Sequence, residues 1–384
     1  MNTTTYALPK NSKAWHNALN DVTHLLPKDL SLDNLAQLPI FAVVVVVDSA
    51  VLPSVSDVDD IMQQWADSQR NWQMQIVHDD ALACANADKI VAGMALADVC
   101  VCRYLLVPTN NINMSATKRE AAAHIIDDQL TSHLRHHLIQ AKSATLSFNQ
   151  HVDVHILSAQ QMLIEPKLVC FDMDSTLIEQ EVIVELAKIA GVAEQVTKIT
   201  ESAMRGEIDF ATSFAKRVAL LEDTPETVVQ DIIQKHISFS SGAYAVMRAL
   251  KAKGCTTVLV SGGFEPFARY VAQMLGMDEY YANPLLVSDG KISGYTDDNI
   301  LDGKQKAHIV ARSAERLGID MAQVVCVGDG ANDLPMMAIS GMGIAYKAKP
   351  IVQAKADASV NITGLEGVLY ALGYRFDKIK SSTI

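Results

Sequence analysis

The chain has 384 residues, of which 49% are hydrophobic and 20% charged, and its formal net charge at pH 7 is −12. This length is enough for two or three domains, each with its own core. The negative balance argues against a nucleic-acid partner, which would need a basic face, but it does not exclude a small anionic substrate held by a metal or a few cations.

Nothing in the sequence predicts export or a membrane partner. The first residues lack a basic stretch followed by a long apolar core, so we expect no secretory signal. The longest apolar run, LPIFAVVVVV, stops at Asp48 and is too short to cross a bilayer. The six cysteines have no metal-site spacing, which predicts reduced, buried thiols in a cytoplasmic protein. Cys100 and Cys102 are expected to point to opposite faces of one strand.

Residues 1–160 are predicted to form a compact α+β domain of the split-βαβ type. No catalytic constellation is evident in them. His133, His136 and His137 have helical spacing and could bind a metal, although we favour a solvated helix face. The predicted strands lie near Phe41–Val47, Gln73–Val77, Val101–Val107 and Val152–Leu157, and the predicted helices near Val55–Gln69 and Lys118–Ala141.

Residues 166–384 have a different pattern, with a domain boundary expected near Pro166. Short β-rich runs (LVCF, TTVLV, VVCVG, MGIAY) alternate with amphipathic helical stretches, which predicts an α/β fold: a Rossmann-like, doubly wound parallel sheet with helices on both faces. Residues 182–241 have helical periodicity and are expected to form an inserted helical cap. Two short β-like runs around SDGK predict a hairpin.

Three of these strands are followed directly by polar clusters. Because ligands gather at the carboxyl ends of the strands in an open parallel sheet, the clusters should meet at one edge. The residues concerned are Asp172 and Asp174 after the first strand, Ser261 with Gly262 and Gly263 after the second, and Asp329, Asn332 and Asp333 after the third.

The expected edge suits a cation and a phosphoryl group. Four carboxylates in one place need a positive charge, and oxygen ligands of this kind select Mg²⁺. Glycines at 262, 263, 328 and 330 let backbone N–H groups approach an anion. A calcium loop starting at Asp172 is excluded, because its sixth and twelfth positions are Leu177 and Ile183. Taken alone, SGG is explained by a turn and GDGAND by the start of a helix. Together with the aspartates after the first strand, in this order and each after a strand, they indicate phosphoryl chemistry.

The motifs DMDST, VSGGF, DGKQKAH and GDGAND resemble those of the haloacid dehalogenase-like phosphotransferases. Glu181, the stretch AMRGEIDFATSFAKRVALL and GDGANDLPM narrow the resemblance to the phosphoserine phosphatases of that superfamily. The resemblance runs from about Pro166 to the C-terminus. Residues 1–160 match only loosely, although some members carry ACT-like regulatory domains there.

The resemblance implies a role for each aspartate. Asp172 would be the nucleophile that becomes an aspartyl phosphate, and Asp174 the general acid and base. Mg²⁺ would bind the carboxylates of Asp172 and Asp329 and the backbone carbonyl of Asp174, with Asp333 holding a metal-bound water.

The resemblance also implies the groups that bind the phosphate. Lys306 would neutralise the aspartate–phosphate pair; Lys304 is the competing lysine, and Lys306 has the better spacing to Asp329. Ser261, Gly262 and Asn332 would donate hydrogen bonds to the phosphate.

The cap is expected to select the substrate. Glu181 and Arg217 would pair with the ammonium and carboxylate of phosphoserine, unless Glu181 is a solvated helix residue and Arg217 a surface partner of Glu222. Met204 and Phe210 would form an apolar lid.

The resemblance thus implies a Mg²⁺-dependent hydrolase that releases phosphate from L-phosphoserine, the last step of serine biosynthesis. Two alternatives stay open: transfer of the phosphoryl group to another alcohol such as homoserine, and a non-catalytic amino-acid sensor. Serine or another amino acid is the candidate ligand of the N-terminal domain, and a homodimer is the candidate assembly.

Overall fold

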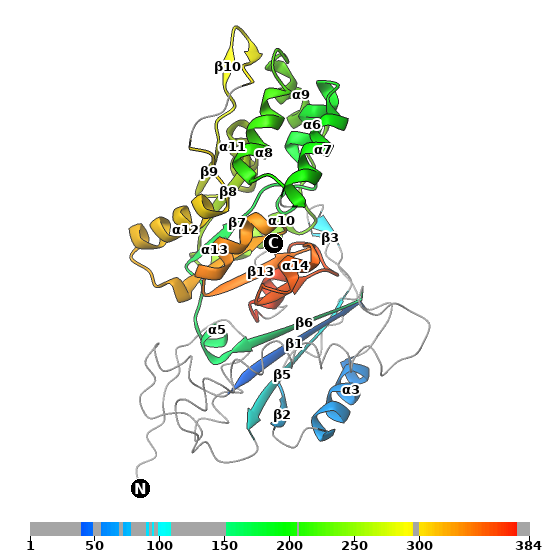
Figure 1. Cartoon of the computed structure of the whole chain (residues 1–384). Coiled ribbons are helices and arrows are strands. Elements are labelled where there is room, and N and C mark those ends of the chain that lie inside the picture. Colours follow the sequence, from blue (N-terminus) through cyan, green and yellow to red (C-terminus); the bar gives the residue numbers. More distant parts are fainter. Residues whose placement is uncertain are drawn as a thin grey trace. The chain divides into compact units, whose positions relative to one another are not determined.

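The structure is a computed structural model of the chain (Figure 1). It describes residues 40–48, 55–68, 72–77, 90–91, 94–95, 99–108, 151–205, 207–294 and 299–374. The chain divides into two compact units, Met1–Glu165 together with Asp357–Ile384 (unit 1) and Pro166–Ala356 (unit 2). The sequence interpretation had placed residues 357–384 with the catalytic half, whereas here they group with unit 1.

Unit 1 contains a four-stranded antiparallel sheet with the order β2-β5-β1-β6. The predicted α+β class is confirmed, as are the four strands and the first helix; the helix predicted near Lys118–Ala141 and the three histidines lie outside the described residues. The elements are β1 (Phe41–Asp48), α3 (Val55–Ser68), β2 (Trp72–Ile76), β3 (Ile90–Val91), β4 (Met94–Ala95), β5 (Val99–Pro108), β6 (Val152–Ser158), α5 (Ala159–Leu163), β14 (Ala358–Val360) and α15 (Gly367–Ala371).

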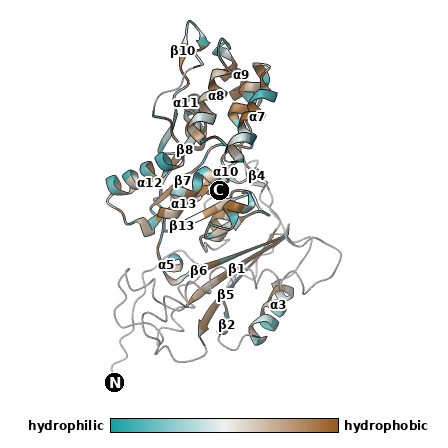
Figure 2. Ribbon diagram, viewed as in Figure 1, coloured by the Kyte–Doolittle hydropathy of each residue, from teal (hydrophilic) through white to brown (hydrophobic). Residues whose placement is uncertain are grey.

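One face of this sheet forms an apolar core with α3. Alternate residues such as Val43 and Val45 of β1 pack with Met62 and Trp65 of the helix, and Figure 2 shows these strands as hydrophobic. Cys100 and Cys102 both belong to this core, with their Sγ atoms 3.8 Å apart. The expectation that they point to opposite faces is wrong, because residues two apart on a strand share a face.

The other residues of the same strands are also buried, and some are charged. Asp153 of β6 is 1% exposed. Its carboxylate accepts hydrogen bonds from the backbone N–H and side-chain amide of Asn361, at 2.7 and 2.9 Å, and from the Ile362 N–H at 3.1 Å. Buried Arg103 donates from Nη2 to the carbonyl of Tyr374 at 2.7 Å. These bonds explain why the segment after residue 356 belongs to unit 1.

Unit 2 is built on the predicted parallel sheet, in which the strands of this unit have the order β13-β12-β7-β8-β9. Its elements are β7 (Leu168–Phe171), α6 (Val182–Ile189), α7 (Ala193–Met204), α8 (Phe210–Ala219), α9 (Thr227–Lys235), α10 (Ala243–Ala252), β8 (Thr256–Phe264), α11 (Glu265–Leu275), β9 (Glu279–Asn283), β10 (Val287–Ser288), β11 (Lys291–Ile292), α12 (Gly303–Leu317), β12 (Val324–Gly328), α13 (Leu334–Ile339), β13 (Met342–Tyr346) and α14 (Pro350–Gln353), with 3₁₀ turns at Met321–Gln323 and Ala331–Asp333.

The central strands of unit 2 are buried on both faces, as their continuous apolar runs require. Cys170 of β7 lies beside Cys326 of β12 and Val258 of β8 in the parallel register. These residues form one core cluster with apolar residues of α12 and α13, including Val310 and Met336. The parallel pairing places the carboxyl ends of neighbouring strands close together.

The insert between β7 and β8 is helical, and α6, α7, α8 and α9 gather at one end of unit 2 (Figure 1). The predicted hairpin is also present. β10 pairs with β11 across Asp289 and Gly290, whose φ angles are 51° and 75°. Two positive φ angles are typical of the type I′ turn that an Asp-Gly pair favours.

Within the part of the chain that the structure describes, no helix is long and apolar enough to cross a membrane.

Candidate active site

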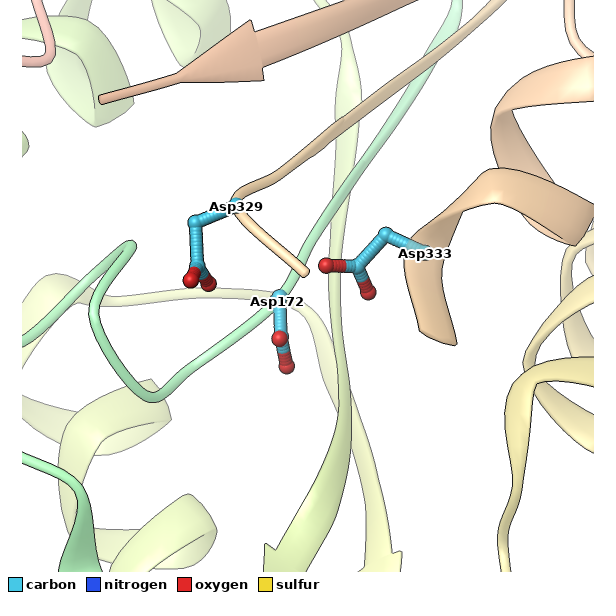
Figure 3. A group of neighbouring side chains, drawn as sticks. All are labelled: Asp172, Asp329 and Asp333. Carbon is cyan, nitrogen blue, oxygen red and sulfur yellow. The ribbon is translucent and has the colours of Figure 1, made fainter. Parts of the chain in front are cut away.

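Three aspartates from separate stretches of the chain meet at the carboxyl edge of the parallel sheet (Figure 3). Asp172 follows β7, Asp329 follows β12, and Asp333 ends the 3₁₀ turn before α13. One oxygen from each carboxylate lies within 4.8 Å of the others. The parallel pairing of β7 with β12 brings them together, because it places the two strand ends side by side.

A buried lysine joins this cluster. The Lys306 Nζ atom lies 2.7 Å from Asp172 Oδ1 and 2.7 Å from Asp333 Oδ1, and its side chain is 0% exposed. Burial alone would lower the pKa of Lys306, but the two carboxylates outweigh it and raise that pKa. Lys304, one helical half-turn earlier on α12, is exposed. Lys306 is therefore the lysine whose charge reaches the aspartates.

The loop after β7 is a tight turn that fixes Asp172. The Met173 N–H donates to Asp172 Oδ1 at 2.7 Å, and Ser175 has a left-handed φ of 56°. On the neighbouring strand, Gly328 makes room for the acid opposite, because a Cβ at this position would lie 2.3 Å from Asp333 Oδ2. The absence of a side chain at Gly328 therefore leaves space for the Asp333 carboxylate, which is an additional reason for a glycine at the start of GDGAND.

Crowding and burial raise the pKa values of the acids. Burial, then Asp333, raises the pKa of Asp172 well above its ordinary value, and Lys306 opposes this. For Asp174 the causes are burial, then Glu181 and Asp172, and its pKa is also well above the ordinary value. Burial, followed by Asp333 and Glu181, raises the pKa of Asp329 to about 7. The cluster thus contains more negative charge than Lys306 alone offsets.

The donor set fits a hard divalent cation. Its members are carboxylate oxygens, which Mg²⁺ prefers, and three of them converge within a few ångströms. Near them, Asp174 Oδ1 is buried and has no hydrogen-bond partner among the described residues. A buried oxygen of this kind is costly unless a cation or a proton accompanies it.

A pocket opens beside the cluster and collects most of the residues that the sequence had singled out. Arg217, on α8, is half-buried and donates from Nε to the Ser213 carbonyl at 3.3 Å. Burial lowers its pKa, while Glu181 and Asp174 raise it. Nine predicted site residues line this pocket: Asp172, Asp174, Glu181, Phe210, Arg217, Ser261, Gly262, Asp329 and Asn332.

Aromatic rings form the apolar wall of the pocket. Phe214 lies one helical turn after Phe210, with ring centroids 6.1 Å apart, and 5.3 Å from the ring of Phe264. A Cβ on Gly262 would lie 3.0 Å from the Phe210 ring, so this glycine allows the cap helix to approach the strand end. Met204 ends α7, and its side chain lies outside the described residues.

Several pocket residues were not found from the sequence. Phe214 repeats the helical spacing of Phe210, a signal that could have revealed it. Lys349 follows another parallel strand, β13, so polar residues after strand ends are the signal that could have revealed it. The residues missed are Ile183, Phe214, Phe264 and Lys349, whereas Gly263 and Gly330 line the pocket as glycines that the sequence had indicated.

The comparisons with known proteins agree with this geometry. Residues 166–341 match the family model described as haloacid dehalogenase-like hydrolase. A probable phosphoserine phosphatase of Schizosaccharomyces pombe is 47% identical over 59% of this chain and 77% of its own length.

Two solved structures are similar as well. One, described as a phospho-aspartyl intermediate analogue of phosphoserine phosphatase, is 40% identical, with a TM-score of 0.51 over 54% of this chain and 98% of that one. A probable phosphoserine phosphatase of Vibrio cholerae is 25% identical, with a TM-score of 0.58 over 95% of both chains.

A parallel sheet with an acidic cluster at its carboxyl edge and a helical cap defines a class of enzymes that act on phosphate groups. The chain belongs to the haloacid dehalogenase-like hydrolases and, within them, to the phosphoserine phosphatase family.

Proposed function

We propose that this chain hydrolyses O-phospho-L-serine to L-serine and phosphate through an aspartyl phosphate on Asp172. The observation that carries the proposal is the contact of Lys306 with Asp172 and Asp333, each at 2.7 Å, beside a pocket that also contains Glu181 and Arg217. This arrangement supports the proposal because a carboxylate, a buried cation, and an acid and a guanidinium that could pair with an amino acid lie at one site.

In the first half-reaction a carboxylate oxygen of Asp172 attacks phosphorus, and the bond from phosphorus to the serine oxygen breaks. The Met173 N–H and Lys306 hold Asp172 in place. Lys306 also keeps positive charge beside the transferring group, where negative charge accumulates. A relative whose structure is described as a phospho-aspartyl intermediate analogue supports this covalent route.

Asp174 is suited to transfer the proton in both half-reactions. Its raised pKa favours a protonated carboxyl, which can donate to the leaving serine oxygen. The resulting carboxylate then removes a proton from the water that attacks phosphorus, and the bond to Asp172 breaks. The buried, unpartnered Oδ1 of Asp174 is the oxygen left for this exchange among the described residues.

We assign the Mg²⁺ site to the carboxylates of Asp172 and Asp329 and the backbone carbonyl of Asp174, with Asp333 acting through a water. When bound, the ion would favour the ionised carboxylates and offset charge on the phosphoryl group. Among the described residues, the convergence of the carboxylates of Asp172, Asp329 and Asp333 supports this assignment.

The cap would recognise the amino-acid part of the substrate. Arg217 can hold a carboxylate through two parallel hydrogen bonds, and Glu181 can accept from an ammonium group. The wall formed by Phe210, Phe214 and Phe264 would exclude water from the reacting phosphate. Ser261, Gly262 and Asn332 line the same pocket, which supports a role for them as hydrogen-bond donors to the phosphate.

The test is phosphate release from O-phospho-L-serine, its D enantiomer and a panel of phosphorylated metabolites, with Mg²⁺ or with a chelator. We expect Mg²⁺-dependent release that prefers phosphoserine. Added homoserine distinguishes a phosphotransferase, because transfer would lower free phosphate and yield a phosphorylated alcohol. An absence of turnover on every substrate would favour the amino-acid sensor.

We also propose a cytoplasmic location, because the five cysteines that the structure describes are all buried thiols.

A further inference from the structure

The carboxyl end of a further parallel strand, β13, also reaches the pocket. β13 pairs in parallel with β12 and ends at Tyr346, and Lys349 lies three residues later among the residues that line the pocket. The polar clusters predicted from the sequence follow β7, β8 and β12 only. The end of β13 therefore adds a cation to a site assembled otherwise from the other strands and the cap.

The backbone around Lys349 is held in place. Its carbonyl accepts from the N–H groups of Val352 and Gln353 at 2.9 and 3.1 Å, so that Lys349 precedes α14 as its N-cap. The Gln353 side chain donates to the carbonyl of buried Ala348 at 2.7 Å. The Lys349 side chain itself is exposed, and none of the described residues forms an ion pair with it. The backbone of Lys349 is therefore fixed, and its side-chain ammonium group is available to interact with an anion.

The pocket needs such a charge, because its lining is acidic. Four of the lining residues are acids, and only two, Arg217 and Lys349, are cationic. Lys306 is buried behind the nucleophile and is already in contact with two carboxylates. A phosphate monoester carries about two negative charges near neutral pH. It therefore has to approach a negatively charged opening, and the exposed ammonium of Lys349 opposes that repulsion. The acids concerned are Asp172, Asp174, Glu181 and Asp329.

We propose that Lys349 is a positioning residue that attracts the phosphate group of the substrate into the pocket and sets the rate of productive association. This inference rests on the proposed function and deepens it. Because Lys349 acts on the phosphate and does not contact the reacting carboxylate, its effect belongs to kcat/KM rather than to kcat. It should also be equal for every phosphate monoester, whatever the alcohol.

The chain offers a matched control in the same turn. Lys347 is exposed, two residues before Lys349, and its Nζ lies 5.4 Å from the ring centroid of Tyr346 rather than in the pocket. Lys347→Gln and Lys349→Gln remove the same charge from the same short segment. A difference between them therefore reports the position of the charge and not the net charge of the protein.

The experiment measures steady-state kinetics with phosphoserine and with an aryl phosphate, at increasing salt. At low ionic strength, Lys349→Gln should lower kcat/KM about threefold to tenfold on both substrates, with kcat unchanged. The difference should vanish at about 1 M salt, where charges are screened within a few ångströms. Lys349→Arg should retain wild-type behaviour, Lys349→Glu should lower kcat/KM further, and Lys347→Gln should match the wild type.

Binding of inorganic phosphate with Mg²⁺, followed by calorimetry, separates this inference from the proposed function because it needs no turnover. Weaker phosphate binding by Lys349→Gln than by Lys347→Gln would support the role of Lys349 even if phosphoserine were not a substrate. Wild-type kinetics and phosphate affinity in Lys349→Gln, or equal losses in both variants, would overturn it while leaving phosphoserine hydrolysis intact.

Discussion

The two sheets of this protein use buried charge in opposite ways. In unit 1 the strands are antiparallel, and the charged residues lie along a face of the sheet. Asp153 is buried there and accepts three hydrogen bonds from Asn361 and Ile362. In unit 2 the strands are parallel, and the charged residues lie at one end. Asp172, Asp329 and Asp333 converge there, and Lys306 contacts only Asp172 and Asp333.

The difference follows from strand direction. Antiparallel strands alternate their ends, so polar groups that follow them are distributed over both edges. Parallel strands all finish at one edge, which concentrates the residues that follow them. A buried charge whose hydrogen bonds are all made stabilises the fold. Like charges that are crowded together shift one another's pKa values and bind cations or substrates.

The largest effect is expected for Asp172→Asn. The replacement keeps the size of the side chain but is a poor nucleophile, so kcat should fall by about 10⁴-fold or more. Thermal unfolding should show a folded protein. Burst phosphorylation retained in this variant would contradict the role of Asp172.

Arg217→Ala should discriminate between substrates. Loss of a charged hydrogen-bond partner should lower kcat/KM for phosphoserine about tenfold to a hundredfold. An aryl phosphate, which has no amino-acid carboxylate, should lose much less. Arg205→Ala is the control, because Arg205 is an exposed cap residue paired with Glu207. Equal losses on both substrates would mean that Arg217 does not bind the carboxylate.

Asp153→Ala tests the structural charge in unit 1. It removes a buried carboxylate that accepts from half-buried donors of Asn361 and Ile362, which should lower the free energy of unfolding by about 2 kcal/mol. Urea denaturation measures this loss. The kcat for phosphoserine should not change at temperatures where the variant is folded. A large fall in kcat with unchanged stability would contradict the structural role of Asp153 and show that unit 1 also supports catalysis.

The smallest effect concerns pH and Mg²⁺. The pKa of Asp329 is raised to about 7, so the metal-free folded state is favoured when this carboxyl is protonated. The stabilisation that protonated Asp329 gives the metal-free folded state is fully present below the ordinary pKa of an aspartate, and it is lost as the pH rises through about 7. Mg²⁺ should therefore raise the melting temperature by more degrees at pH 8 than at pH 5.5, measured by calorimetry. The reverse order would contradict the assigned metal site.

Several features of the site could be predicted because they are local. The aspartates and Ser261 lie directly after apolar strands, and the parallel fold is indicated by the alternation of strands and helices. Asp-Gly at the hairpin has a specific turn conformation that the sequence also indicates. Cys100 and Cys102 lie in one core and not on opposite faces, because residues two apart on a strand point to the same side.

The sequence alone determined which residues carry charge, which runs form strands, and which polar side chains follow them, since each depends on neighbours within a few positions. Only the tertiary structure decided that Lys306 is shared between Asp172 and Asp333, that Lys349 reaches the pocket, and that the segment after residue 356 joins unit 1. These outcomes depend on contacts between residues far apart in the chain. Strand order and packing set such contacts, and no local pattern records them.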